Sequence, residues 1–498
     1  MLLSFKGLKP FQLSEYIFLV LFAFFVPMSW RIATYAMIGL FVCTILKGIF
    51  EEGFKINELQ YRNKFAYFIF IAFWVIYAIS FLYSENTAEA RMQIGKKLSF
   101  LLFPLFFMTS NLSYLTKDRV RTVMYCFVIG ILTLFVINLF WAGYDILFNE
   151  AEIIRLTSPH KFFKTNDTIF TFLHRAHFSL FTCLGFVFCF SEFISTSNVR
   201  LKIFNLIALF VMFFSPFYIY SRAGILCTII ILFALWSWLT FVLKKRKIGF
   251  ITCGIFLTSL IVGYFAFPKT IQRFTDAIEN IQNGKGDCRL TIRNANRYVI
   301  HENFLFGVGS GDRNDETLDS YHRYKNDINN QMKSVKPIDE ELFEKNKQIL
   351  LDSINSKFEN KHNSEVYKYI DSVGEIQGID YSLLKENLSE YQIAKHCIKH
   401  ELNAHNQFSD TIIAVGVIGL ILLLSFFIYP IFLWIKNRNF DIVFFSLLLI
   451  IAFNSLFESV LERQMGIMFF VFFYFLLFHG NFCQQSTDNS QQTLSNLK

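Results

Sequence analysis

Arginine, histidine and asparagine side chains that could act on a charged substrate occupy two stretches of the sequence. Arg289, Arg293 and Arg297 recur at every fourth position, so a helix would carry all three on one face. Three aligned cations repel one another, and arginine matches phosphate oxygens in two-pronged fashion, so the stripe favours a phosphate ligand. His405 and Asn406 stand together in a later polar motif, and a histidine, which titrates near neutral pH, suits a general base.

Plainer interpretations of these residues stay open. A basic stripe is also typical of a solvated helix face or of a contact with anionic lipid. His405 could instead cap a helix that begins near Thr411. Arg222 stands between two apolar runs, where an arginine is costly unless it is paired, so it is either a binding residue or an anchor at the membrane surface. His177, near the start of another apolar run, is a supporting candidate.

The elements that must position these residues are membrane-spanning helices. Only 17% of the 498 residues are charged and 54% are hydrophobic, whereas soluble domains carry about 25% charged residues. Apolar runs of the length needed to cross about 30 Å of hydrocarbon recur about twelve times. They lie near 11–28, 32–50, 65–83, 98–113, 120–143, 174–195, 201–220, 222–243, 248–267, 411–435, 440–457 and 464–480. We therefore predict an all-α, polytopic membrane protein.

The order of apolar and polar stretches predicts the organisation of the chain. It comprises nine spans in 1–267, a large helical loop at 268–410 with a polar insertion at about 313–399, three spans in 411–480 and a disordered tail at 481–498. Most short basic connections, such as that around Lys245, fall on one side, which the positive-inside rule places in the cytoplasm. Both termini are then inside and the large loop outside. Lys96 and Lys97 are exceptions on the outer side. The net charge of +8 follows from these connections, so membrane lipids are predicted partners and nucleic acid is not.

Glycines and cysteines in the large loop suggest structural roles. The spacing of Gly307, Gly309 and Gly311 does not place the third glycine where the GxGxxG dinucleotide fingerprint needs it. No βαβ unit surrounds these glycines either. They are more typical of a helix end followed by a tight turn. Cys288 and Cys397, the two cysteines of this loop, would face an oxidising compartment, either as free thiols or as a disulfide. No cysteine cluster has the spacing of zinc ligands, and no metal or cofactor is predicted.

Three motifs together resemble the O-antigen ligase and polymerase superfamily of bacterial membrane glycosyltransferases, and the resemblance covers nearly the whole chain. They are Ser221-Arg222-Ala223-Gly224 after a span, Arg289-Leu290 leading to the 303–312 segment, and Ala404-His405-Asn406-Gln407-Phe408 running into 415–419. The chain departs from the family where a tryptophan often follows the loop arginine. Here Ile292-Arg293 stands instead.

The resemblance implies a GT-C-like fold and a glycan-transfer reaction. A glycan would pass from undecaprenyl diphosphate to an acceptor hydroxyl at the outer face of the bacterial cytoplasmic (inner) membrane, without a metal or a nucleotide sugar. With lipid A–core as acceptor the protein would be an O-antigen ligase of lipopolysaccharide biosynthesis. With a second lipid-linked repeat it would be a polymerase of O-antigen, capsule or exopolysaccharide. The implied roles are diphosphate binding by Arg222, Arg289 and Arg293, general-base catalysis by His405, and support by Asn406, His177, Gly307 and Gly309.

A transporter or flippase for lipid-linked sugars is the rival class. Transporters usually show internal repeats and polar groups on broken helices at mid-membrane. The sequence shows no internal repeat, and its polar motifs gather on one loop. A noncatalytic assembly factor would leave the His405 motif unexplained.

Overall fold

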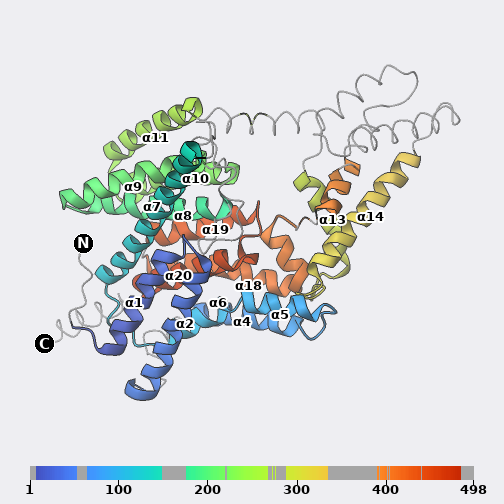
Figure 1. The fold of residues 1–498 in the computed structure, drawn as a ribbon, viewed down its shortest axis with the longest axis horizontal. Helices are drawn as coiled ribbons and strands as arrows, with labels where there is room; N and C mark the ends of the chain where they lie inside the picture. The colour runs from blue at the N-terminus through green and yellow to red at the C-terminus, as the bar shows by residue number, and fades with distance from the viewer. Residues whose placement is uncertain are drawn as a thin grey trace. The chain divides into compact units, whose positions relative to one another are not determined.

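The computed structural model describes residues 7–52, 64–148, 175–218, 221–266, 272, 275, 288–334, 390–391, 393–400, 402, 404–438 and 440–483. Within these ranges the secondary structure is helical, with no strand, so the all-α prediction is confirmed for them (Figure 1). The α-helices are α1 (Pro10–Phe25), α2 (Trp30–Lys47), α4 (Lys64–Ser80), α5 (Thr87–Lys96), α6 (Ser99–Thr109), α7 (Lys117–Phe148), α8 (Arg175–Ser195), α9 (Val199–Tyr218), α10 (Arg222–Ser237), α11 (Arg246–Ala266), α13 (Cys288–Glu302), α14 (Arg313–Ser334), α18 (Gln407–Asn437), α19 (Ile442–Ser455) and α20 (Gln464–Phe478). Short 3₁₀ or π turns are η1 (Gly48–Glu52), η4 (Trp238–Val242), η5 (Val460–Glu462) and η6 (His479–Cys483).

Apolar helices long enough to cross a membrane confirm the multi-pass membrane character. In the described ranges, 7 helices have the required length and composition, and three shorter apolar helices add to them. Each of the twelve predicted apolar runs overlaps one of the helices above. The number of spans stays a prediction, because α6 covers only 11 residues.

The chain divides into two compact units. The first comprises residues 1–274, 305–312 and 405–498, and the second comprises 275–304 and 313–404. The predicted large loop is thus not a single body, because its 305–312 segment and its last residues belong with the membrane helices. Most of the predicted 313–399 insertion and the tail from 484 lie outside the described residues.

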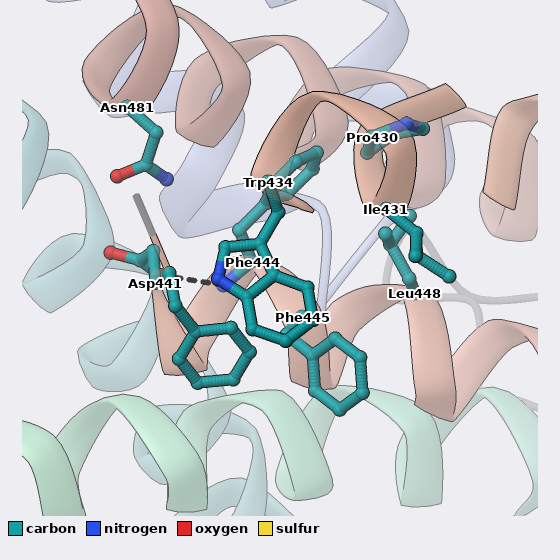
Figure 2. A pocket seen from close by; sticks show the side chains of 9 residues that line it. Pro430, Ile431, Trp434, Asp441, Phe444, Phe445, Leu448 and Asn481 are labelled. Atoms are coloured by element: carbon teal, nitrogen blue, oxygen red, sulfur yellow. Dashed lines mark hydrogen bonds between the residues drawn. The ribbon is translucent and has the colours of Figure 1, made fainter. Parts of the chain in front are cut away.

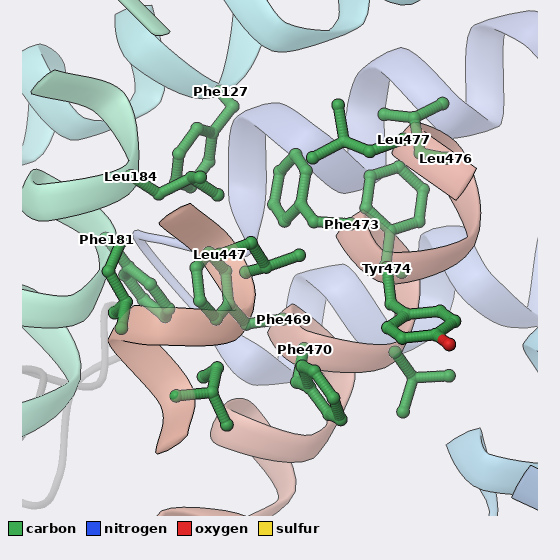
Figure 3. Packing of buried hydrophobic residues seen from close by; sticks show 14 of the residues in the cluster. Phe127, Phe181, Leu184, Leu447, Phe469, Phe470, Phe473, Tyr474, Leu476 and Leu477 are labelled. Atoms are coloured by element: carbon green, nitrogen blue, oxygen red, sulfur yellow. The ribbon is translucent and has the colours of Figure 1, made fainter. Parts of the chain in front are cut away.

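The core of the first unit is built around α20, in which every side chain from Met465 to Phe478 is buried. A helix that is apolar on all sides belongs inside a bundle. Figure 3 shows its rings among those of neighbouring helices: Phe469 lies 4.5 Å from Phe181 of α8, and Phe473 lies 4.5 Å from Phe127 of α7, between ring centroids. Such aromatic pairs add free energy beyond the area that they bury.

The outward faces of several helices are apolar as well. Phe210 of α9 and Phe250 of α11 are 67% and 68% exposed. Exposed rings of this size would be costly in water but match the hydrocarbon of a bilayer. The apolar outer surface therefore agrees with a membrane environment.

The second unit is a small helical cluster. α13, α14 and the helical residues 393–399 enclose a core whose members are Ile292, Ala295, Tyr321, Ile393 and Cys397. The Tyr321 hydroxyl donates to the Leu402 carbonyl at 2.9 Å. The core uses one face of α13, which leaves the other face of that helix for polar side chains.

Lys97, an exception to the charge pattern, is buried in the first unit. Its side chain is 0% exposed, and its Nζ lies 2.8 Å from the Glu462 carboxylate. The ammonium also lies 4.3 Å from the ring centroid of Tyr77. Lys97 is therefore neutralised by an internal partner and does not act as a surface charge on the predicted outer side.

Candidate functional site

Asn406 forms the start of α18, directly after His405. Its Oδ1 accepts hydrogen bonds from the backbone N–H groups of Phe408 and Ser409 at 2.9 and 3.1 Å. Its Nδ2 donates to the Leu456 carbonyl at 3.2 Å. The helix begins at Gln407 and is capped by Asn406. The alternative in which His405 caps a helix beginning near Thr411 is therefore wrong.

The backbone of His405 adopts the left-handed conformation, with φ of 45°. Few residues other than glycine do so, and such strain gathers at functional sites. The imidazole is 30% exposed, and its Nδ1 lies 3.4 Å from Oε2 of Glu458, which is 25% exposed. A carboxylate at Nδ1 orients the ring and leaves Nε2 as the nitrogen that can take a proton.

Glu458 was not among the predicted site residues. Its only signal in the sequence is that it is one of three charged residues, with Glu462 and Arg463, in the short gap between the apolar runs 440–457 and 464–480. Its backbone N–H donates to the Asn454 carbonyl at 2.9 Å, which continues the end of α19. The carboxylate therefore comes from the connection between α19 and α20, and only the fold brings it to His405.

Hydrogen bonds from Gln407 hold this connection against the start of α18. Gln407 Oε1 accepts from the Leu461 backbone N–H at 2.6 Å, and its Nε2 donates to Glu462 Oε1 at 3.3 Å. Lys97 binds the other oxygen of the same carboxylate. All these side chains are buried. The connection that carries Glu458 is therefore held by Gln407 on one side and by Lys97 on the other.

The glycine segment 305–312 inserts into a break in α18. At Gly416 the backbone has φ of 69°, and the carbonyls just before the break accept hydrogen bonds from outside the helix. The Val308 N–H donates to the Ile413 carbonyl at 2.8 Å, and the Gly309 N–H to the Ala414 carbonyl at 3.1 Å. Gly307 and Gly309 also have positive φ angles, 70° and 102°. These two glycines thus shape a turn whose backbone binds α18.

The same segment is anchored on its other side to the end of α4. The Asp312 carboxylate accepts from the backbone N–H groups of Glu85 and Asn86 at 2.8 and 2.7 Å. Ser310 and Ser80 join through their hydroxyl groups at 2.8 Å. Residues 305–312 therefore hold the first turns of α18, which follow His405, in a fixed position relative to α4.

Arg222 and His177 lie where α8, α10 and α20 begin. Arg222 is the half-buried first residue of α10, and the N-cap Ser221 donates to the Ser179 hydroxyl of α8 at 3.3 Å. A Cβ built on Gly466 would lie 3.0 Å from Nε2 of the buried His177. The starts of α8, α10 and α20 therefore meet, and the turn η5 joins α20 to the Glu458 connection.

The arginine stripe lies on α13 in the second unit. Arg289 is half-buried in the first turn, and Arg293 and Arg297 are exposed. Ile292 and Ala295 occupy the buried face. The predicted two-faced helix is present, and it belongs to a different unit from Arg222 and His405.

Cavities occur at the opposite end of the bundle. A cavity of about 470 Å³ is lined by Lys117 at the start of α7, Glu192 near the end of α8 and Asn481 beyond α20. Figure 2 shows an adjacent small pocket in which Trp434, Asp441 and Phe444 lie close together, with Asp441 capping α19. Because α18 and α19 run between His405 and these residues, neither cavity belongs to the candidate site.

The candidate site is therefore a histidine–carboxylate pair at the end of the bundle where Arg222 and His177 also lie. In the described ranges, no group of three or more His, Cys, Asp or Glu side chains is arranged to hold a metal ion. No protein-family model matches the sequence, and no curated protein matches it either.

Proposed function

We propose that the protein transfers a glycan from undecaprenyl diphosphate to an acceptor hydroxyl at the outer face of the bacterial cytoplasmic membrane. We propose lipid A–core as the acceptor, which makes the protein an O-antigen ligase. The observation that carries the proposal is the partly exposed His405, with Nδ1 facing Glu458 at 3.4 Å, at one end of an apolar helical bundle.

The proposed reaction is a displacement at the anomeric carbon. His405 Nε2 takes the proton of the acceptor hydroxyl as its oxygen attacks, and the bond from the anomeric carbon to the diphosphate breaks. The diphosphate leaves with the bonding electrons. Positive charge at that position stabilises the transition state. Arg222, at the positive end of α10, supplies it. The stripe on α13 with Arg289 and Arg293 is proposed as a phosphate-binding surface of the second unit.

The arrangement of polar groups supports transfer over transport. His405, Arg222 and His177 stand at the starts of helices, at one end of the bundle. A transporter for lipid-linked sugars would instead place its binding groups at mid-membrane on broken helices. The one break described above, at Gly416, is filled by backbone from the 305–312 segment.

The test is transfer by the purified full-length protein in lipid vesicles with undecaprenyl-diphosphate-linked O-antigen and lipid A–core. His405→Ala is expected to lower turnover by about 10²–10⁴-fold, the usual cost of removing a general base. Donor binding and melting temperature stay near those of the wild type. His322→Ala, an exposed histidine of α14, is the matched control.

Two further variants in the same assay test the diphosphate contact. Arg222→Lys and Arg289→Lys keep the charge but lose the two-pronged geometry, so both are expected to weaken donor binding. Polymer appearing on the carrier instead of on lipid A–core would make the protein a polymerase. A stable His405→Ala protein with near-normal turnover would refute the catalytic role.

A further inference from the structure

Two cysteines meet in the core of the second unit. Cys288 is the first residue of α13, and Cys397 lies on the helical residues 393–399. Their Sγ atoms are 3.4 Å apart, although the residues are separated by 109 positions. Cys397 is fully buried in the apolar cluster with Ile292 and Tyr321, whereas Cys288 is half-buried. The fold thus brings the two sulfurs into contact.

We propose that Cys288 and Cys397 form a disulfide bond that fixes α13 to the helical residues 393–399. A disulfide needs an S–S distance of about 2.05 Å, so the sulfurs have to approach by only about 1.4 Å more. The bond would close a loop that contains α14 and most of the second unit. This inference does not depend on the proposed glycan transfer.

The bond forms by thiol–disulfide exchange with a thiol oxidoreductase that carries a reactive disulfide. The Cys288 thiolate attacks one sulfur of that disulfide and expels the other as a thiolate. Cys397 Sγ then loses its proton and attacks Cys288 Sγ, which releases the second sulfur of the oxidant. The two cysteines together lose two protons and two electrons, and the oxidant becomes a dithiol.

Exposure decides the order of these steps. Cys288 is the cysteine that an outside protein can reach, because Cys397 is 0% exposed. Contact with the Cys288 thiol, together with burial, raises the pKa of the Cys397 thiol well above its usual range. Once Cys288 is in a mixed disulfide, that thiol contact no longer holds the proton on Cys397.

The bond would act on the arginine helix at its first turn. Arg289 adjoins Cys288, and the remaining arginines of the stripe follow on the same helix. A bridge at the first turn prevents that end of α13 from fraying and so restricts where the Arg289 guanidinium can go. The covalent tie thus pre-organises the first arginine of the stripe.

The test uses the full-length chain in its own membranes. Thiols are blocked with N-ethylmaleimide at lysis, and unreduced peptides are analysed by mass spectrometry. A linked pair of peptides containing Cys288 and Cys397 is expected, and it disappears on reduction and in Cys288→Ser. Cys183 of α8 and Cys227 of α10 also contact each other, but both are buried among membrane helices, where an oxidoreductase cannot reach them. They are the matched control and are expected to be recovered as thiols.

A stability measurement gives a second readout. Reduction of the wild type is expected to lower the melting temperature of the second unit by roughly 5–15 °C. The double variant Cys288→Ser/Cys397→Ser starts at the lower value and does not respond to the reductant. Recovery of both cysteines as alkylated thiols in membranes overturns the proposal. That result leaves the His405 assay, and with it the proposed function, untouched.

Discussion

His405 combines a left-handed backbone with a carboxylate at its Nδ1. The backbone conformation costs about 1–3 kcal/mol in a residue that has a Cβ. The cap formed by Asn406 and the buried hydrogen bonds of Gln407 offset this cost from the positions that follow. The contacts of Asn406 and Gln407 therefore stabilise the strained backbone of His405. In this conformation the imidazole faces Glu458.

Glu458→Gln tests whether the carboxylate positions His405. We expect turnover to fall by roughly 10-fold or more, less than in His405→Ala, because the amide can still accept from Nδ1. The measurement is kcat and KM of the purified variant, and kcat is expected to fall while the KM for the donor stays near that of the wild type. A lower melting temperature with an unchanged kcat would make Glu458 a structural residue only.

At the residue scale, the sequence predicted the site residues that stand next to each other in one motif. His405 and Asn406 stand next to each other just before the run 411–435, so their joint position near a span was predictable, whereas the cap formed by Asn406 was not. Glu458 is 53 positions further on, and Lys97 contacts a residue 365 positions away. No local pattern encodes such pairs, because tertiary packing alone decides which loops face each other.

The element that determines the site most directly is α18, with its internal break. The break lets carbonyls of the helix accept hydrogen bonds from Val308 and Gly309. Without it, the 305–312 segment would have no backbone partners on α18, and the helix start beside His405 would lose one of its contacts with α4. A single glycine conformation thus connects three distant parts of the first unit.

Gly416→Ala is expected to destabilise the first unit by about 1–3 kcal/mol from the positive φ alone. A Cβ at this position would also lie 2.1 Å from the Leu305 carbonyl oxygen, so the backbone there has to move. Gly95→Ala is the matched control, because a Cβ on Gly95 meets nothing within 4 Å. Thermal melting of both purified variants checks the prediction. Equal melting temperatures would mean that the break does not need glycine.

At the element scale, apolar runs predicted helices well. A segment inside hydrocarbon must satisfy its backbone hydrogen bonds internally, so a long apolar run has few alternatives to a helix. The break in α18 was not predictable, because Val415 and Gly416 lie inside the uninterrupted run 411–435. The glycine turn at 307–311 was predicted, but its partner was not.

Over the whole molecule, charged residues line the cavity at one end of the first unit. Lys117 and Arg121 line it together with Glu192 and Asp441. Asp441 caps α19 a few residues after the end of α18, and His405 stands just before the start of α18. The charged cavity and the candidate site therefore lie at opposite ends of α18.

A topology experiment tests what that separation means. A reporter enzyme fused at Lys347 is expected to be active only outside the cytoplasm, and one fused after Lys247 only inside. The sequence predicts this arrangement from the basic connections, and the internal pairing of Lys97 removes an apparent exception. A cytoplasmic location for Lys347 would contradict the proposed reaction, because the glycan donor would be on the other side.

The ion pair between Lys97 and Glu462 has a consequence for biosynthesis. The ribosome adds the lysine 365 residues before the carboxylate that pairs with it. During that interval the nascent chain holds an ammonium group whose burial is costly without the acid. The segment around Lys97 is therefore expected to reach its final packing only after Glu462 has been added.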